Sequence, residues 1–251
     1  RGIDQAVSAG GLRVGVGGSG YDPHEEEALL RSLLSWRPAA LIVTGLDHAP
    51  QTRTMLAKAG LTVVEIMDID AAAVDIAIGM SHRRAGEAMA RHLLERGYRR
   101  FGYVGHDLTR DLRAARRREG FVTALQAAGA TLADEVVLDA PSSTARGRDA
   151  LARLLAQTPE VDAVYFSNDD MAVGGYFHCL DAALAVPDRI ALAGFNGLEI
   201  GQPLPRPLTT TLTHRFDIGR LAGEAVLARM RGETAGALTD VGFDLIPGAT
   251  A

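Results

Sequence analysis

Short apolar segments alternate with longer amphipathic segments along almost the whole chain. The short segments are rich in Val, Ile, Leu and Phe and are bounded by turn residues, which is typical of buried strands. We predict strands at residues 12–16, 40–44, 62–66, 101–104, 136–138, 163–166, 190–195, 208–213 and 241–246, with a further apolar run at 75–79. Apolar residues that recur every three or four positions predict helices at 1–9, from 22, at 51–59, 81–97, 113–128, around 151–155, from 171 and at 216–230.

The alternation of strands with helices indicates βαβ units and therefore parallel sheets. The number of predicted strands favours two doubly wound sheets over one. The fold class expected from the pattern is thus α/β, with two parallel-sheet subdomains.

One strand–turn–helix segment, VDAVYFSNDDMAVG at 161–174, is the best candidate for a binding site. Ser167, Asn168, Asp169 and Asp170 directly follow the predicted strand, at the end where open α/β sheets place ligands. A bound polyol or sugar acid would find hydrogen-bonding side chains there. The alternative is that these four residues only cap the helix that follows, because their short oxygens accept hydrogen bonds from unpaired backbone N–H groups.

The sequence motifs give little support for a bound cofactor, a metal site or a catalytic site. The GVGGSG sequence at 15–20 matches a dinucleotide fingerprint, but Pro23 and three glutamates follow it where a pyrophosphate would have to lie. We therefore expect no nucleotide cofactor. The seven histidines show no metal-ligand spacing, and Asp169 and Asp170 are better explained as capping residues, so no metal is expected. No nucleophile elbow or acid–base pair is recognisable, which argues against an enzyme.

Composition narrows the class further. The chain has 251 residues, 47% of them hydrophobic, which suits one or two domains with a sizeable core. Its net charge of −5 makes it a poor binder of nucleic acid by itself. Cys179 is the only cysteine, so an internal disulfide is excluded and a reducing cytoplasm is allowed. No apolar run approaches the ~20 residues that a membrane span needs.

Three linked motifs resemble the lactose/galactose-repressor family of bacterial transcription regulators. They are VDAVYFSNDDMAVGGYFHCLDAAL, VPDRIALAGFNGLEIG and PLTTTLTHRFDIGRLAGEAVLARM, with GYRRFGYVG and RAARRREGF upstream. The segments APSSTARGR and VVEIMDID are similar to the gluconate-repressor branch. The resemblance implies two subdomains joined by three crossings, one at 1–79 plus 214–244 and the other at 80–213 plus 245–251. It also implies that the first strand and the DNA-binding helix-turn-helix domain precede this sequence.

The resemblance also suggests which residues line a cleft between the subdomains. Arg117 matches the arginine of the family's R-x-x-G motif, which reaches ligand oxygens, and Arg113 shares its helical face. Asn196 stands where lactose and purine members carry Asp, which removes a charge that would repel an anion. Pro141 replaces an aromatic that stacks on the ligand. With Met80 at the first crossing and Asn168, these form the predicted set: Met80, Arg113, Arg117, Pro141, Asn168 and Asn196.

The function implied is effector sensing and dimerisation in a cytoplasmic repressor that responds to a sugar acid such as gluconate. Operator DNA would be bound only through the missing N-terminal domain. The leucines at 29, 30, 33 and 34 cannot all face one core, so we expect a homodimer that uses helices of the first subdomain. A periplasmic sugar-binding protein of the same fold is the alternative.

Overall fold

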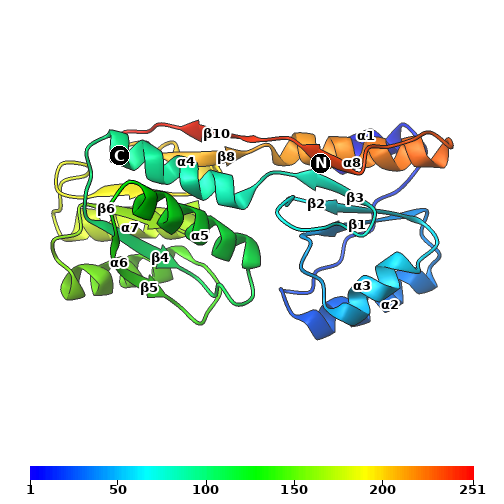
Figure 1. The fold of residues 1–251 in the computed structure, drawn as a ribbon, viewed down its shortest axis with the longest axis horizontal. Helices are drawn as coiled ribbons and strands as arrows, with labels where there is room; N and C mark the ends of the chain where they lie inside the picture. The colour runs from blue at the N-terminus through cyan, green and yellow to red at the C-terminus, as the bar shows by residue number, and fades with distance from the viewer. The chain divides into compact units, whose positions relative to one another are not determined.

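A computed structural model describes all residues from 1 to 251, which fold into two compact units. The first unit comprises Arg1–Ser81 and His214–Gly242, and the second comprises His82–Thr213 and Phe243–Ala251. The chain therefore passes from one unit to the other three times (Figure 1). The first passage lies between Ser81 and His82, two residues after the boundary that we predicted at 79/80. The third lies between Gly242 and Phe243, two residues before the boundary that we predicted at 244/245.

The first unit is built on a four-stranded parallel sheet in the order β1-β2-β3-β9. Its strands are β1 (Ala40–Thr44), β2 (Thr62–Ile66), β3 (Ile76–Gly79) and β9 (Leu238–Asp240). Its helices are α1 (Gly2–Ser8), α2 (Pro23–Ser35), α3 (Pro50–Ala57) and α8 (Arg215–Met230). Asp22 starts α2, because its carboxylate accepts hydrogen bonds from the backbone N–H groups of His24 and Glu25.

The two faces of this sheet are buried in two separate apolar clusters. Val63 packs with Leu30 of α2 and Leu56 of α3, whereas its neighbour Val64 packs with Ile218 of α8. Successive strand residues point to opposite faces, so both must be apolar when helices cover both sides. The continuous apolar run at 62–66 is explained by this burial.

The second unit contains a four-stranded parallel sheet in the order β5-β4-β6-β7 and a two-stranded antiparallel sheet of β8 and β10. The strands are β4 (Phe101–Gly105), β5 (Leu132–Val137), β6 (Ala163–Phe166), β7 (Ala191–Ala193), β8 (Thr210–Thr213) and β10 (Phe243–Ile246). The helices are α4 (His82–Glu95), α5 (Leu112–Ala127), α6 (Thr144–Gln157), α7 (Asp169–Asp181) and the short 3₁₀ helix η1 (Glu199–Gly201).

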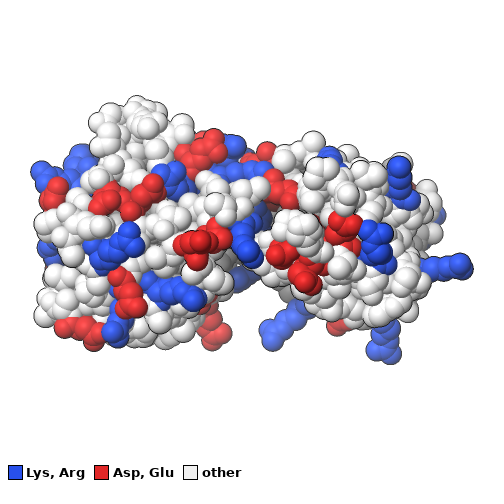
Figure 2. Space-filling model, turned by 90° about the horizontal axis from the view of Figure 1, so that it is seen from below, with Lys and Arg blue, Asp and Glu red and all other residues white.

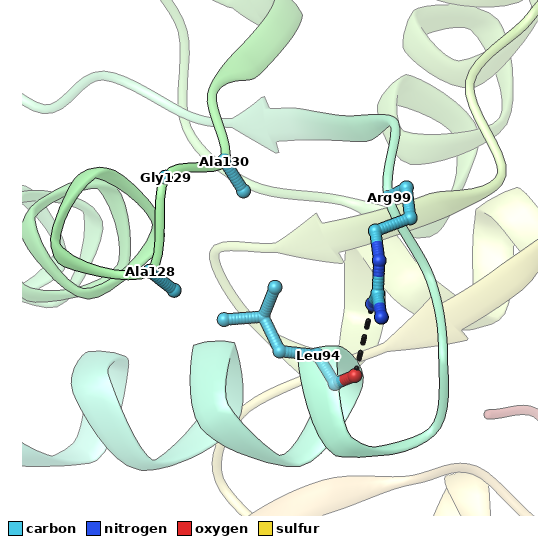
Figure 3. Close-up of a pocket in the computed structure, with 5 residues that line it drawn as sticks. All are labelled: Leu94, Arg99, Ala128, Gly129 and Ala130. Atoms are coloured by element: carbon cyan, nitrogen blue, oxygen red, sulfur yellow. Dashed lines mark hydrogen bonds between the residues drawn. The ribbon is translucent and has the colours of Figure 1, made fainter.

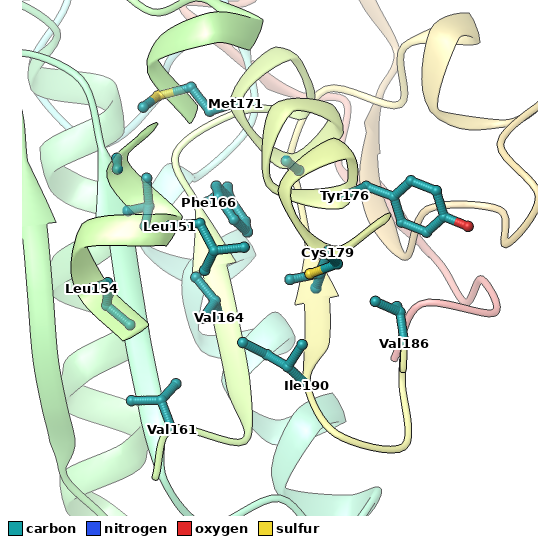
Figure 4. Packing of buried hydrophobic residues seen from close by; sticks show 14 of the residues in the cluster. Leu151, Leu154, Val161, Val164, Phe166, Met171, Tyr176, Cys179, Val186 and Ile190 are labelled. Carbon is teal, nitrogen blue, oxygen red and sulfur yellow. The ribbon is translucent and has the colours of Figure 1, made fainter. Parts of the chain in front are cut away.

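Helices cover both faces of this parallel sheet as well. Tyr103 and Tyr165 lie in the cluster under α4 and α5, and their neighbours Val104 and Phe166 lie in the cluster under α6 and α7. Figure 4 shows the second cluster, in which Phe166 lies between α6 and α7. The doubly wound α/β fold expected from the sequence is confirmed for both units.

Two of the predicted strands need correction, and one further strand is added. Residues 12–16 form no strand, and Val16 is 91% exposed, because no strand pairs with this segment and an unpaired extended backbone gains no ladder hydrogen bonds. The strand predicted at 136–138 is β5, which starts at Leu132. It is an edge strand and tolerates Asp134 and Glu135, which concealed it. The exposed strand β9 was not predicted.

Charged side chains of both signs are mixed on the surface. On the face shown in Figure 2, Lys and Arg alternate with Asp and Glu over each unit, and neither sign forms a broad field there. None of the helices combines the length and apolarity that crossing a bilayer requires.

Candidate functional site

Polar side chains follow three adjacent strands of the second unit at their carboxyl ends. His106 follows β4, Ser167 and Asn168 follow β6, and Asn196 comes soon after β7. Because β4, β6 and β7 are parallel neighbours, these residues meet at one edge of the sheet. We call this group, together with side chains of α4 and α5 that reach it, the candidate site. It comprises His82, His106, Asp111, Arg113, Arg117, Ser167, Asn168, Phe195 and Asn196.

Arg117 of α5 is the central side chain of the candidate site, and it is only 4% exposed. Its Nη2 donates to the backbone oxygen of Ser167 at 2.9 Å, and its Nη1 donates to Nδ1 of His82 at 2.9 Å. Its guanidinium lies over the ring of Phe195, with Cζ 3.8 Å from the ring centroid. Nε has no hydrogen-bond partner. These contacts with Ser167, His82 and Phe195 fix the guanidinium in place at the carboxyl ends of the strands.

The contact with Arg117 also fixes the tautomer of His82. A guanidinium carries only donors, so the ring nitrogen that accepts from it has no proton. The ring of His82 also packs against Phe195, with the centroids 5.7 Å apart.

His106 links the loop after β4 to two other elements. Its Nδ1 lies 2.8 Å from Oγ of Ser167, and its Nε2 lies 3.2 Å from Oδ2 of Asp111, the N-cap residue of α5. Burial raises the pKa of Asp111, but the hydrogen bond with His106 and the charges of Arg117 and Arg113 outweigh it. These groups hold the pKa of this carboxyl well below its usual range. An ionised Asp111 therefore balances part of the local positive charge.

Asn168 is the N-cap of α7, where its Oδ1 accepts a hydrogen bond from the backbone N–H of Met171 at 3.1 Å. The capping interpretation of Asn168 is therefore confirmed. Its side-chain nitrogen makes no hydrogen bond within the chain, so one residue serves as a cap and still offers a donor at the sheet edge.

Asn196 adopts an unusual backbone conformation, with φ at 119°. Such a conformation costs a non-glycine residue about 1–3 kcal/mol and persists only when the surroundings enforce it. Here the backbone N–H of Asn196 donates to the oxygen of Thr211 at 2.9 Å, and its backbone oxygen accepts from Oγ1 of Thr213 at 3.3 Å. The carboxamide makes no hydrogen bond within the chain and offers both a donor and an acceptor.

Four of the six predicted ligand residues lie in the candidate site, namely Arg113, Arg117, Asn168 and Asn196. Pro141 is exposed in the loop after β5, where the oxygen of its neighbour Ala140 accepts from the backbone of Asp107. Met80 is fully buried and belongs to the first unit.

Several residues of the candidate site were missed by sequence reasoning. The rule that singled out Asn168, a polar residue directly after a buried strand, also applies to His106 and would have found it. The contact of Phe195 with Arg117 has no sequence signal, because an apolar residue at the end of a strand is expected in any core. Asp169 was predicted only as a capping residue, whereas its carboxylate also accepts from Leu198 and Thr210 outside α7.

The structure shows no group of three or more His, Cys, Asp or Glu residues placed to hold a metal ion. A pocket of about 430 Å³ lies on the second unit, lined by Leu94, Arg99, Ala128, Gly129 and Ala130 (Figure 3). There Nη1 of Arg99 donates to the oxygen of Leu94 at 3.1 Å. Arg99 precedes β4, so this pocket lies toward the amino ends of the strands and is separate from the candidate site.

The first unit has a buried charged cluster of its own. Nδ1 of His48, in the loop after β1, lies 2.8 Å from Oε1 of Glu26 on α2, and its Nε2 lies 3.5 Å from Oε1 of Glu65 on β2. Burial lowers the pKa of His48, but the two carboxylates outweigh it and raise the pKa to about 9. His48 is therefore positively charged at neutral pH and compensates the fully buried Glu65.

The chain consists of two parallel-sheet α/β units joined by three crossings, and hydrogen-bond donors converge at the carboxyl ends of the strands in the second unit. This combination is typical of ligand-binding proteins of the periplasmic-binding-protein-like class. The family model described as periplasmic binding proteins and sugar binding domain of LacI family matches residues 1–241, and the chain belongs to this family. The resemblance seen in the sequence motifs is thereby confirmed.

Relatives with known names support the same grouping. The HTH-type transcriptional regulator GntR of Escherichia coli K12 is 36% identical over 251 residues, which cover 100% of this chain and 75% of that protein. The regulator of the same name from Pseudomonas aeruginosa is 40% identical over 238 residues, 94% of this chain and 69% of that protein.

Solved structures agree with this fold. The transcription regulator GntR from Chromobacterium violaceum superposes with a TM-score of 0.94 at 39% identity and covers 99% of this chain and 92% of that one. A LacI family regulator from Silicibacter pomeroyi superposes with a TM-score of 0.96 at 39% identity and covers 99% of this chain and 75% of that one.

Proposed function

We propose that this chain is the ligand-sensing and dimerisation domain of a bacterial transcriptional repressor that acts in the cytoplasm and responds to a sugar acid of the gluconate type. The observation that carries the proposal is the buried guanidinium of Arg117 beside the NH₂ group of Asn168 and the carboxamide of Asn196, which make no hydrogen bonds within the chain. The names of the relatives, HTH-type transcriptional regulators, support the regulatory part.

The charges favour an acid over a neutral sugar. Arg117 is held by contacts with Ser167 and His82 that leave its charge without a carboxylate in direct contact, and a ligand carboxylate suits such a group. Asn196 adds hydrogen-bonding capacity without a negative charge. A sugar acid offers both the carboxylate and the hydroxyls that this set of side chains recognises.

Operator DNA is assigned to a helix-turn-helix region outside this chain, and the ligand acts on it allosterically. A ligand controls DNA binding only through its different affinities for two states of the protein. The family also includes periplasmic binding proteins, which remain the alternative, but the regulator names of the relatives at 36–40% identity favour the repressor.

Ser167, His106 and Asp111 have the composition of a catalytic triad, but we assign them no catalysis. Ser167 is 1% exposed, and its Oγ lies 3.4 Å from the sulfur of Met171, so a substrate carbonyl has no approach to it. The network instead ties the loop after β4 to the loop after β6 and to α5.

The homodimer stays a proposal, and the leucines of α2 contribute less exposed surface to it than the sequence suggests. Leu30, Leu33 and Leu34 pack in the cluster under α2 and α3, and the side chain of Leu29 lies against Gly17. Trp36, which follows α2, is 74% exposed. Leu30 is therefore taken up by the core of the first unit, whereas Leu29, Leu33 and Leu34 are half-buried and keep some exposed surface for a dimer interface. Sedimentation of the intact protein at micromolar concentration tests the dimer, and a monomer would contradict it.

Titration calorimetry with gluconate and glucose tests the ligand. We expect gluconate to bind more tightly than glucose. Arg117→Lys should weaken gluconate by roughly 10- to 150-fold, because the lysine ammonium lacks the planar donors of the guanidinium and loses a charge-assisted hydrogen bond that contributes on the order of 1.5–3 kcal/mol. Lys is preferred to Ala because it keeps a positive charge near the Ser167 carbonyl. Arg110→Ala is the control, since this arginine of the same basic run is exposed. Absence of gluconate binding would contradict the sugar-acid assignment.

A further inference from the structure

Asp169, the first residue of α7, is fully buried, and its carboxylate contacts the loop that carries Asn196. Its Oδ2 accepts from the backbone N–H of Leu198 at 2.6 Å, and its Oδ1 accepts from Oγ1 of Thr210 at 2.6 Å. Its own backbone N–H donates to the oxygen of Phe195 at 2.9 Å. One residue of α7 is therefore bonded to both sides of Asn196.

The Thr210 hydroxyl extends this contact to the residue next to Asn196. While it donates to Asp169, its Oγ1 accepts from the backbone N–H of Gly197 at 3.4 Å. The two N–H groups that follow Asn196 along the chain are thus held by Thr210 and Asp169. Asn196 has a positive φ, which costs a non-glycine residue free energy, so the turn depends on such contacts to persist.

The approach of Asp169 to this loop also requires a glycine. A Cβ at Gly194 would overlap Oδ1 of Asp169, so no larger residue fits between the end of β7 and the carboxylate. Both carboxylate oxygens are directed at the loop and at β8. The acceptor geometry therefore excludes the simpler interpretation that Asp169 only caps its own helix.

We propose that Asp169 is a positioning residue for effector binding: with Thr210 as its relay, it holds the turn that presents the Asn196 carboxamide at the carboxyl edge of the sheet. This inference rests on the proposed function only in that Asn196 contacts the effector. Asp169 acts through the turn, because it is fully buried and both of its oxygens accept hydrogen bonds from the chain.

The first experiment measures the turn itself and needs no ligand. Amide hydrogen exchange of the full 251-residue chain reports the N–H groups of Gly197 and Leu198. In Asp169→Asn, one side-chain oxygen becomes an NH₂ group that cannot accept from its former donor. We expect exchange at these amides to accelerate by about tenfold or more relative to the rest of the second unit. Thr210→Val removes the relay hydroxyl and should act in the same direction, whereas Thr210→Ser should restore protection.

Thr211→Val is the matched control. Thr211 is the neighbouring, equally buried threonine of β8, and its hydroxyl has no hydrogen-bond partner. Val161→Ala, in the core of the same unit, controls for general destabilisation. A purely structural role for Asp169 would lower Tm, as Val161→Ala does, without selective exchange at 197–198. That result would overturn the proposal.

The second experiment is calorimetry of the same variants with gluconate and with glucose. A displaced turn weakens every ligand that uses Asn196, so Asp169→Asn and Thr210→Val should lower affinity for both sugars by similar factors, about tenfold. Thr210→Ser and Thr211→Val should bind as the unaltered chain does. Selective tightening of gluconate in Asp169→Asn would instead show that the charge acts directly on the ligand, and it would overturn the positioning role.

The two proposals fail in different ways. If the unaltered chain binds neither sugar, the sugar-acid assignment is wrong, and the exchange measurement still decides whether Asp169 holds the turn. If gluconate binds and the 197–198 amides are unaffected by Asp169→Asn, the positioning role is wrong and the proposed function stands.

Discussion

The guanidinium of Arg117 lies over the ring of Phe195, with Cζ 3.8 Å from the ring centroid. Phe195 is 2% exposed and precedes Asn196 directly. This contact joins α5 to the loop after β7, while the hydrogen bond from Arg117 to the Ser167 carbonyl joins α5 to the loop after β6. One arginine therefore connects the elements that carry the two asparagines.

Phe195→Leu tests that connection. Leucine fills much of the same volume but lacks the ring face that attracts a cation, a contribution of about 0.5–2 kcal/mol at such sites. We expect affinity for gluconate to fall by about 2- to 30-fold, measured by calorimetry, with a modest decrease in Tm. Phe166→Leu, a buried phenylalanine of the core under α6 and α7, is the control and should lower Tm without this loss of affinity. Equal effects of the two variants on binding would contradict the role assigned to Phe195.

Asn196→Asp tests the charge preference of the site. Asp tolerates a positive φ nearly as well as Asn, so the turn should be preserved. The added carboxylate repels an anionic ligand at close range but accepts hydrogen bonds from neutral hydroxyls. We expect gluconate to weaken by about tenfold or more and glucose to change little.

Asn196→Gly is the matched variant for that measurement. It removes the carboxamide and relieves the backbone, so both sugars should lose affinity by similar factors. If Asn196→Asp also weakens both equally, the ligand carboxylate does not lie near this position.

Much of the fold follows from local patterns in the sequence. The strands at 40–44 and 62–66 are predicted to the residue, because apolar runs bounded by turns coincide with strands buried on both faces. The helix start at Asp22 and the cap at Asn168 were also readable, since capping chemistry involves residues only two or three positions apart.

The remainder depends on partners distant in sequence. Residues 12–16 have a strand-like composition but nothing to pair with, and composition does not report pairing. Likewise, Arg117 and Asn196 were predicted to approach one ligand, but the Phe195 ring that connects them has no local signature. The spacing of apolar residues along the sequence indicates which side chains are buried, but it does not indicate which residues each buried side chain contacts.

His48 makes the stability of the first unit depend on pH. Its pKa is about 9 in the folded chain against 6.5 for an ordinary histidine, because Glu26 and Glu65 favour the charged form. A folded-state pKa above the unfolded value stabilises the fold fully below pH 6.5, and this contribution is lost as pH rises through 9. Urea unfolding should therefore show a stability difference between the chain and His48→Gln that shrinks from pH 6 to pH 9.5.

His24→Gln is the control for the pH series, because His24 is exposed at the start of α2 and only its backbone is hydrogen-bonded there. It shows what replacing an exposed histidine by glutamine does to stability over the same pH range. A constant difference for His48→Gln would show that the buried cluster does not titrate as its geometry implies.

The position of Arg117 depends finally on how closely α4 and α5 approach. Gly86 of α4 and Gly120 of α5 lie at the crossing, where an added Cβ at Gly86 would overlap the backbone oxygen of Arg117 itself. Gly86→Ala must therefore push α5 outward and withdraw the guanidinium from Ser167 and Phe195. We expect Tm to fall and gluconate affinity to drop by about tenfold or more, since overpacking of this kind typically costs 1–3 kcal/mol. Gly18→Ala, where the added Cβ meets nothing within 4 Å, should change neither quantity. Unchanged binding in Gly86→Ala would mean that Arg117 does not require the close helix crossing to reach the ligand.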